Sequence, residues 1–194
     1  MKLFKKDGAD IGIDLGTANV LIYRQGEGII LNQPSIVAVD NLTKKVIAVG
    51  EEAYSMIGRT NNNIELIRPL KDGVIADFDV TCEMIKIFLN KVDSRNFIKL
   101  NQPKILICCP TNITSVDRDA IAKVAELAGA SEVFIQEEPK VAAVGAGLSI
   151  FEPLGNMVID IGGGTTDIAV LSMGEIVNSS SLKVAGDLLT QDIN

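Results

Sequence analysis

One stretch near the carboxyl end of the chain decides the fold and reads Val158-Ile159-Asp160-Ile161-Gly162-Gly163-Gly164-Thr165. It combines a short β-branched strand, an aspartate at the strand end and a turn rich in glycine and threonine. An earlier stretch, Gly12-Ile13-Asp14-Leu15-Gly16-Thr17, has the same order of strand, aspartate, apolar residue, glycine and threonine. We interpret the pair as a weak internal repeat, which predicts two related half-domains.

The segments around these stretches predict an α/β fold in which a mixed sheet is flanked by helices. Short β-branched runs between Gly, Asn, Pro or Asp indicate strands, and helical periodicity of apolar residues indicates helices. The predicted strands are 9–15, 20–24, 28–31, 35–40, 46–49, 105–109, 133–135, 157–161 and 168–171. The predicted helices are 51–57, 80–92, 115–128 and 139–148.

The helix at 115–128 has the clearest signals. A capping box, Thr114-Ser115-Val116-Asp117, starts it and Gly129 ends it. Its spacing predicts one buried face, made of Val116, Ala120, Val124 and Leu127.

The order of elements predicts three parts. Residues 1–31 and 78–150 are expected to form a first subdomain, with residues 32–77 inserted as a small subdomain. Residues 151–194 are expected to begin the second half-domain, which is incomplete because so short a segment cannot bury a core of its own.

Composition excludes several classes of protein. The 194 residues include 18 Lys and Arg against 25 Asp and Glu, for a net charge of -7, and no His. Without His, neither a Ser-His-Asp triad nor a Cys-His pair can form, and the three cysteines, Cys82, Cys108 and Cys109, are expected to pack in the core as reduced thiols. Metal chemistry must therefore use carboxylates, and the acidic balance argues against nucleic acid as a partner. We find no signal peptide or membrane-spanning run, so a cytoplasmic location is expected.

The two glycine-threonine turns are candidate phosphate-binding loops. Glycine lets backbone N–H groups approach an anion, and Thr and Asn side chains add hydrogen bonds. The first turn is Gly16-Thr17-Ala18-Asn19 and the second is Gly162-Gly163-Gly164-Thr165-Thr166. The alternative for the second turn alone is a plain hairpin. A dinucleotide fingerprint does not fit, because the triple glycine is followed by a strand and not by a helix.

Three carboxylates accompany these turns. Asp14 and Asp160 end corresponding strands, and on two facing half-domains they would converge as a magnesium site; either alone is equally well explained as a turn former. Glu138 precedes Pro139 at a helix start and could orient a water for attack on a phosphoryl group. From spacing alone, a favourable interaction with the helix dipole explains Glu138 better.

Four stretches closely resemble the bacterial actins of the MreB/Mbl family, over nearly the whole chain. They are Asp14-Leu15-Gly16-Thr17-Ala18-Asn19, Arg68-Pro69-Leu70-Lys71-Asp72-Gly73-Val74-Ile75-Ala76-Asp77, Glu137-Glu138-Pro139 and Asp160-Ile161-Gly162-Gly163-Gly164-Thr165-Thr166-Asp167. The resemblance implies a ribonuclease-H-like actin fold and a cytoplasmic ATPase with ATP and Mg²⁺ as cofactors. It also implies filaments on the inner face of the membrane that control cell shape and direct cell-wall synthesis.

By the same resemblance, Asp14 and Asp160 would hold hydrated Mg²⁺ and Glu138 would position the hydrolytic water. Both turns would hold the phosphates, and Gly186-Asp187 would lie near the nucleotide. The implied partners are further copies of the chain, the inner membrane surface and the membrane proteins of shape determination or cell-wall synthesis. The sequence itself suggests which residues contact the membrane, namely Phe97, Ile98 and Leu100 in an otherwise polar loop, together with Lys2, Phe4, Lys5 and Lys6. The alternative is that Phe97 and Ile98 cap the core beneath the loop.

The chain departs from the family in length. Members of the family are considerably longer, so the chain is expected to be an amino-terminal part with little ATPase activity of its own. The alternatives are a non-hydrolysing structural or capping subunit of such filaments and, less well supported by the motifs, a fragment of an Hsp70-like chaperone.

Overall fold

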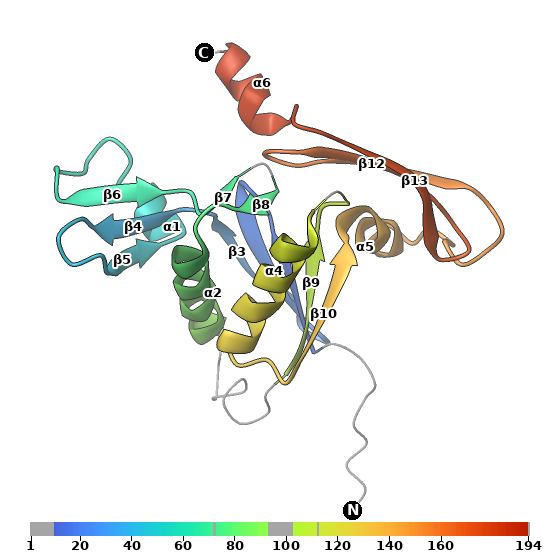
Figure 1. The fold of residues 1–194 in the computed structure, drawn as a ribbon, viewed down its shortest axis with the longest axis horizontal. Helices are drawn as coiled ribbons and strands as arrows, with labels where there is room; N and C mark the ends of the chain where they lie inside the picture. The colour runs from blue at the N-terminus through green and yellow to red at the C-terminus, as the bar shows by residue number, and fades with distance from the viewer. Residues whose placement is uncertain (1–9, 72, 93–102, 112, 194) are drawn as a thin grey trace, which may run out of the picture.

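The computed structural model describes residues 10–71, 73–92, 103–111 and 113–193. Its largest sheet has five strands in the order β10-β9-β1-β2-β3 (Figure 1). β1 pairs in parallel with β9, and β9 in parallel with β10, so the carboxyl ends of these three strands lie at one edge. The strands are β1 (Ile11–Leu15), β2 (Asn19–Arg24), β3 (Gly28–Pro34), β9 (Lys104–Cys109) and β10 (Glu132–Glu137).

Two helices, α2 (Phe78–Val92) and α4 (Ser115–Leu127), cover one face of this sheet (Figure 1). Side chains alternate along β1, so that Ile11 and Ile13 enter the core beneath the helices while Asp14 lies on the other face. The predicted capping box of α4 is confirmed, with Thr114 and Asp117 bonded reciprocally. The predicted buried face of α4 is only partly right: Ile121, Val124 and Ala125 are buried, whereas Val116 is 74% exposed.

The chain between β3 and α2 forms a second, small sheet in the order β5-β4-β6. The expected helix 51–57 is only four residues long, and β6 and the short pair β7–β8 were not predicted. The bounds are β4 (Val37–Asp40), β5 (Val46–Val49), α1 (Glu51–Tyr54), β6 (Ile64–Ile67), β7 (Leu70–Lys71) and β8 (Val74–Ile75).

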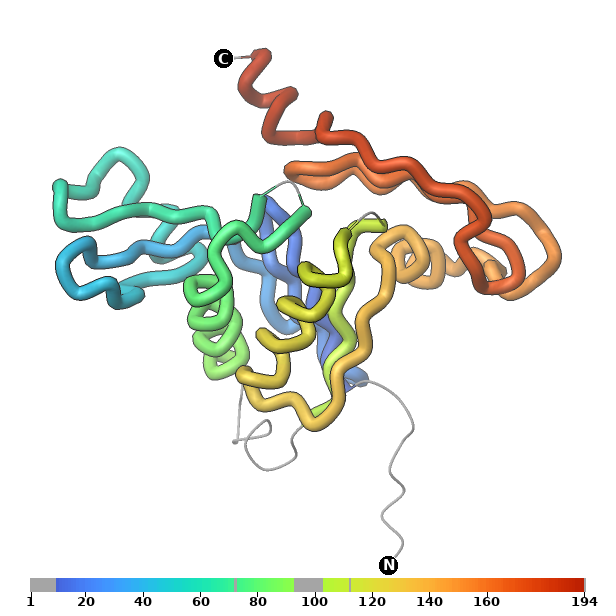
Figure 2. The backbone as a smooth tube through the Cα atoms, in the orientation of Figure 1, coloured from blue at the N-terminus to red at the C-terminus, as the bar shows by residue number. Residues whose placement is uncertain are grey.

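A third, antiparallel sheet contains β11 (Asn156–Ile161), β12 (Thr166–Ser172) and β13 (Glu175–Leu182). Helix α5 (Glu138–Gly145) contacts both this sheet and strands β9 and β10, so it joins the third sheet to the five-stranded sheet. Helix α6 (Gly186–Ile193) follows β13. The tube in Figure 2 shows the turn between β11 and β12 reaching back toward the carboxyl edge of the first sheet. The opposite surface of the third sheet is apolar but uncovered, with Met157, Ile159 and Ile161 exposed.

Some predicted features fall outside the described residues, namely the proposed membrane-contacting side chains at Lys2, Phe4, Lys5, Lys6, Phe97, Ile98 and Leu100. None of the helices in the described part of the chain combines the length and apolar character needed to cross a membrane. Cys82 and Cys109 are buried free thiols as expected, whereas Cys108 is only half-buried.

Candidate functional site

The two predicted loops meet above the carboxyl edge of the five-stranded sheet. We call residues 16–19, after β1, the first clip and residues 162–165, after β11, the second clip. Gly163 lies so close to the first clip that a Cβ on it would be 2.7 Å from Ala18 Cβ. Gly16 is equally constrained, because its Cβ would be 2.6 Å from the backbone oxygen of Asn19. Both glycines therefore permit backbone approaches that a side chain would block.

Two further backbone segments dock on the clips. The N–H groups of Gly186 and Asp187, at the start of α6, donate to the carbonyls of Gly162 (3.1 Å) and Gly163 (2.9 Å). On the other side, Gly73 N–H donates to Thr17 Oγ1 at 3.2 Å. The clips, Gly73 and the start of α6 thus surround one space.

That space is a cavity of about 520 Å³. Of the fourteen sequence-predicted residues, all except Thr166 line it. The lining comprises Asp14, Leu15, Gly16, Thr17, Ala18, Asn19, Leu21, Gly73, Glu138, Asp160, Ile161, Gly162, Gly163, Gly164, Thr165, Gly186, Asp187 and Thr190. Thr166 does not line the cavity: it is the first residue of β12, and its hydroxyl donates to Val184 O at 2.6 Å.

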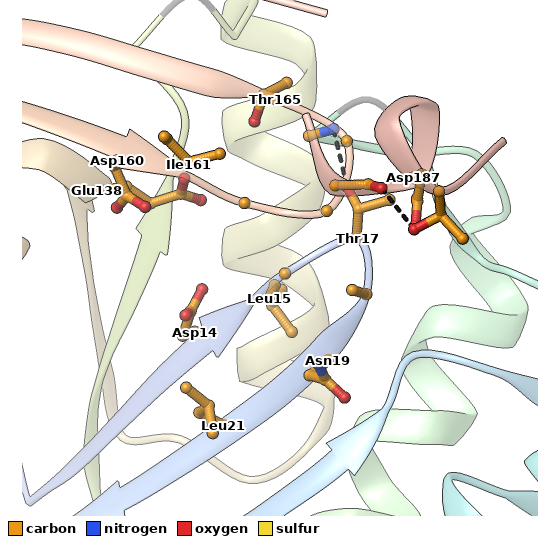
Figure 3. A pocket seen from close by; sticks show the side chains of 18 residues that line it. Asp14, Leu15, Thr17, Asn19, Leu21, Glu138, Asp160, Ile161, Thr165 and Asp187 are labelled. Carbon is orange, nitrogen blue, oxygen red and sulfur yellow. Dashed lines mark hydrogen bonds between the residues drawn. The ribbon is translucent and has the colours of Figure 1, made fainter. Parts of the chain in front are cut away.

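The carboxylates gather at one end of this cavity. Figure 3 shows Asp14, Glu138 and Asp160 together, whereas Thr17 and Asp187 lie at the other end. Asp14 lies near the carboxyl end of β1 and Glu138 directly follows β10, so both lie at the same edge of the parallel part of the sheet. Asp160 comes to this place from the third sheet, near the end of β11.

The charges of this group oppose one another. Burial raises the pKa of Glu138 to about 8, and the carboxylates of Asp14, Asp167 and Asp160 add to the shift. Burial and then Asp160 raise the pKa of Asp14 to about 6, and burial and Asp167 raise that of Asp160. Concentrated negative charge at the end of a cavity lined by glycine and threonine favours a bound cation beside a bound anion.

Comparison with known proteins shows to which family the chain belongs. The family model described as MreB/Mbl protein matches residues 8–194. The chain belongs to the MreB/Mbl family. Its relatives include the cell shape-determining protein Mbl of Bacillus cereus, 66% identical over 184 residues, and the cell shape-determining protein MreB of Escherichia coli, 51% identical over 188 residues. Each match covers 95% of this chain, but this chain spans only 55% of the Mbl relative and 54% of the MreB relative.

Solved structures agree with the family assignment. The crystal structure of MreB 5 of Spiroplasma citri bound to AMPPNP superposes with a TM-score of 0.87 at 44% identity, covering 97% of this chain and 56% of that one. The MamK double helical filament shares the fold, with a TM-score of 0.75 at 20% identity over 93% of this chain and 56% of that one. The predicted α/β, actin-like fold class is therefore confirmed.

The donor set of this MreB/Mbl chain suits magnesium. Besides burial, the carboxylate of Asp160 raises the pKa of Asp14, and Asp14 and Asp160 together raise the pKa of Glu138, so a cation bound beside them would offset this repulsion. Mg²⁺ keeps most of its waters and needs only one or two carboxylates besides phosphate oxygens. Within the described residues, no group of three or more Asp, Glu, Cys or His side chains is arranged to hold a metal ion.

Sequence reasoning missed one charged residue of this region. Asp167 is 1% exposed and accepts hydrogen bonds from the hydroxyl (3.1 Å) and N–H (3.4 Å) of Thr111. It adds to the raised pKa values of Glu138 and Asp160. Its sequence signals were its place at the end of the fourth stretch that resembles the family and its position one residue into a strand, where alternation turns it to the same face as Thr165.

Proposed function

We propose that this chain carries the phosphate and magnesium end of an ATP site and serves a bacterial actin that forms filaments and controls cell shape. One observation supports the proposal most strongly: the first and second clips touch at Ala18 and Gly163, around a cavity with Asp14, Glu138 and Asp160 at one end. The relative bound to AMPPNP and the cell shape-determining relatives agree with it.

Each group then has a role in the proposal. The clips hold the phosphates through backbone N–H groups and Thr17, with Gly186 and Asp187 closing the wall behind them. Asp14 and Asp160 hold hydrated Mg²⁺, which neutralises phosphate charge when bound. Glu138 accepts a hydrogen bond from the attacking water and so fixes its position.

Sedimentation tests the filament part of this function. We expect a protein that carries this chain at the length of its relatives to pellet, above a critical concentration, with Mg·ATP but not in EDTA. Glu138→Ala in that protein is expected to slow phosphate release while nearly preserving ATP binding. A pellet that is absent at every concentration would contradict self-assembly, and loss of ATP binding in the variant would assign Glu138 a structural role.

Membrane association is the third part of the proposal, together with contacts to membrane proteins of shape determination or cell-wall synthesis. Each buried apolar side chain contributes about 1.5–3 kcal/mol, so Phe97 and Ile98 give one subunit a marginal anchor that a filament multiplies. Flotation with anionic liposomes tests this: the Phe97→Ser, Ile98→Ser double variant should lose binding. Unchanged flotation would reject these two residues as the anchor.

A non-hydrolysing structural subunit is the second candidate, and the composition of the cavity favours it. The large apolar side chains that the described residues contribute to the lining are Leu15, Leu21 and Ile161. A base-binding pocket is usually mostly apolar and buries most of its ligand. The measured turnover of Mg·ATP by this chain separates the two candidates.

A further inference from the structure

The first clip is held from behind by a residue that does not line the cavity. Ser35 is fully buried, at 0% exposure, between the end of β3 at Pro34 and the start of β4 at Val37. Its hydroxyl donates to the carbonyl of Gly16 at 2.6 Å, and its N–H donates to the carbonyl of Ala18 at 2.9 Å. One residue therefore satisfies two alternate carbonyls of the clip.

These bonds fix the direction of the clip's peptides. In a planar trans peptide the carbonyl and the following N–H point in opposite directions. Because the Gly16 carbonyl points to Ser35, the N–H of Thr17 points away from Ser35. Thr17 lines the cavity and Ser35 does not. The same bonds keep the oxygens of Gly16 and Ala18, which would repel an anion, turned toward the interior.

We infer that Ser35 is a positioning residue for phosphate binding: its hydroxyl sets the orientation of the Gly16–Thr17 peptide so that the clip presents an N–H group, and not a carbonyl oxygen, to an anion. This inference rests on the proposed function, since it takes the anion to be a phosphate. Without the hydroxyl, the carbonyl of the half-buried Gly16 lacks this partner, and rotation of the peptide is the route to a new one.

The position of Ser35 also links the clip to the small sheet. The chain leaves the five-stranded sheet at Pro34 and enters the small sheet at Val37, so Ser35 lies in the outgoing connection. The return connection reaches the same clip through Gly73 N–H and Thr17 Oγ1. That second bond holds the side chain of Thr17, whereas Ser35 holds the backbone, so of these two bonds it is that of Ser35 that acts on the orientation of the clip's peptide.

The test compares Ser35→Ala with a matched control elsewhere. Thr81 is also 0% exposed, and its hydroxyl donates to the carbonyl of Asp77 at 2.6 Å at the start of α2, away from the cavity. Thr81→Val therefore removes a buried hydroxyl bond of the same kind. Phosphorus NMR titration with Mg·tripolyphosphate and Mg·ATP measures affinity, and thermal unfolding measures the loss of stability.

We expect Ser35→Ala to weaken both ligands about tenfold, corresponding to about 1.4 kcal/mol, while Thr81→Val leaves both affinities unchanged at a similar loss of stability. Ser35→Thr, which keeps the donor, should recover affinity wherever unfolding shows that it folds. The inference is overturned if Ser35→Ala binds the two ligands as tightly as the unchanged chain does. It is also overturned if Ser35→Ala and Thr81→Val weaken ligand binding equally.

A measurement without ligand separates this inference from the proposed function. The amide resonance of Thr17 in the free chain should move in Ser35→Ala and stay in place in Thr81→Val. If the unchanged chain binds neither phosphate ligand but the Thr17 resonance still moves, the proposed function fails, whereas the orientation of the Gly16–Thr17 peptide by Ser35 stands. A resonance that does not move overturns the positioning role whatever the affinities are.

Discussion

Gly163 and Ala18 bring the two halves of the site into contact: a Cβ on Gly163 would lie 2.7 Å from Ala18 Cβ and 3.1 Å from Ala18 N. Real Cβ atoms do not approach one another so closely, so the contact requires glycine at position 163. The two residues belong to loops about 145 residues apart in the sequence, and their contact closes the cavity between the first and third sheets.

Gly163→Ala is expected to separate the clips. The added methyl group must displace Ala18 or the second clip, which costs about 1–3 kcal/mol in a packed region. We expect a lower unfolding temperature and weaker binding of Mg·ATP. Ala18→Gly in the same chain should restore part of both losses, because it removes the atom that the new methyl group meets.

Gly155→Ala is the control for the loss of a glycine, since a Cβ there would meet no atom within 4 Å. Its unfolding temperature and its affinity should stay close to those of the unchanged chain. If Gly163→Ala behaves like Gly155→Ala, the close approach of the clips does not matter for binding.

Glu138→Gln is expected to stabilise the chain in a pH-dependent way. Burial and three carboxylates raise the pKa of Glu138 from 4.5 to about 8, so in EDTA the folded chain retains a proton that the unfolded chain loses between these values. Stability therefore falls as pH rises through this window. The gain from Glu138→Gln should be absent near pH 4 and reach about 1–3 kcal/mol above pH 8.

Urea unfolding at several pH values measures this gain, and Glu65→Gln, on an exposed position of β6, is the control for losing one negative charge. A gain from Glu138→Gln that is the same at pH 4 and pH 8 would contradict the titration argument. Saturating Mg²⁺ should reduce the gain, because the cation offsets the same repulsion.

The uncovered face of the third sheet is expected to make the chain associate. Met157, Ile159 and Ile161 are 60%, 55% and 65% exposed along one strand, and contiguous apolar surface promotes association. Ile159→Thr should lower binding of a hydrophobic dye and reduce oligomer formation, with a stability change within about 0.5 kcal/mol. Leu171→Ala, on the covered face at 0% exposure, should instead cost about 2–5 kcal/mol. Unchanged dye binding in Ile159→Thr would show that another apolar surface causes the association.

The contact between the repeated stretches could be anticipated from a local pattern and its repetition. Each aspartate lies at the end of an apolar strand, before a glycine-rich turn, and the repeat of this pattern predicts two facing half-domains. The repeat added the expectation that Asp14 and Asp160 face each other, and both line the same cavity. Thr166 does not line the cavity, because β12 begins at Thr166 and alternation turns its side chain away from Thr165 and Asp167.

Other features depended on packing that no local pattern contains. Val116 and Val124 lie on one stripe of α4, yet Val124 is buried and Val116 is 74% exposed, because α2 and the sheet cover only part of that stripe. β6 is four residues long and contains Glu65, so its pairing with β4, and not its composition, makes it a strand. The sequence gives no indication that Ser35 bonds to the first clip, since a serine after proline is ordinary in a turn.

The unchanged 194-residue chain is expected to bind Mg·ATP weakly and to distinguish poorly between ATP and GTP. The cavity that the described residues form is lined by backbone, threonine and carboxylates, which recognise phosphates and a cation common to both nucleotides. Apolar contacts with a base normally supply much of the affinity, and polar groups placed at the edge of the base supply the choice between bases. Charge contacts open to solvent weaken with salt. Calorimetry at low and physiological salt should therefore give similar, salt-sensitive affinities for the two nucleotides, with negligible hydrolysis. A micromolar or tighter dissociation constant for Mg·ATP, with turnover abolished by Asp160→Ala, would show instead that this chain completes the site by itself.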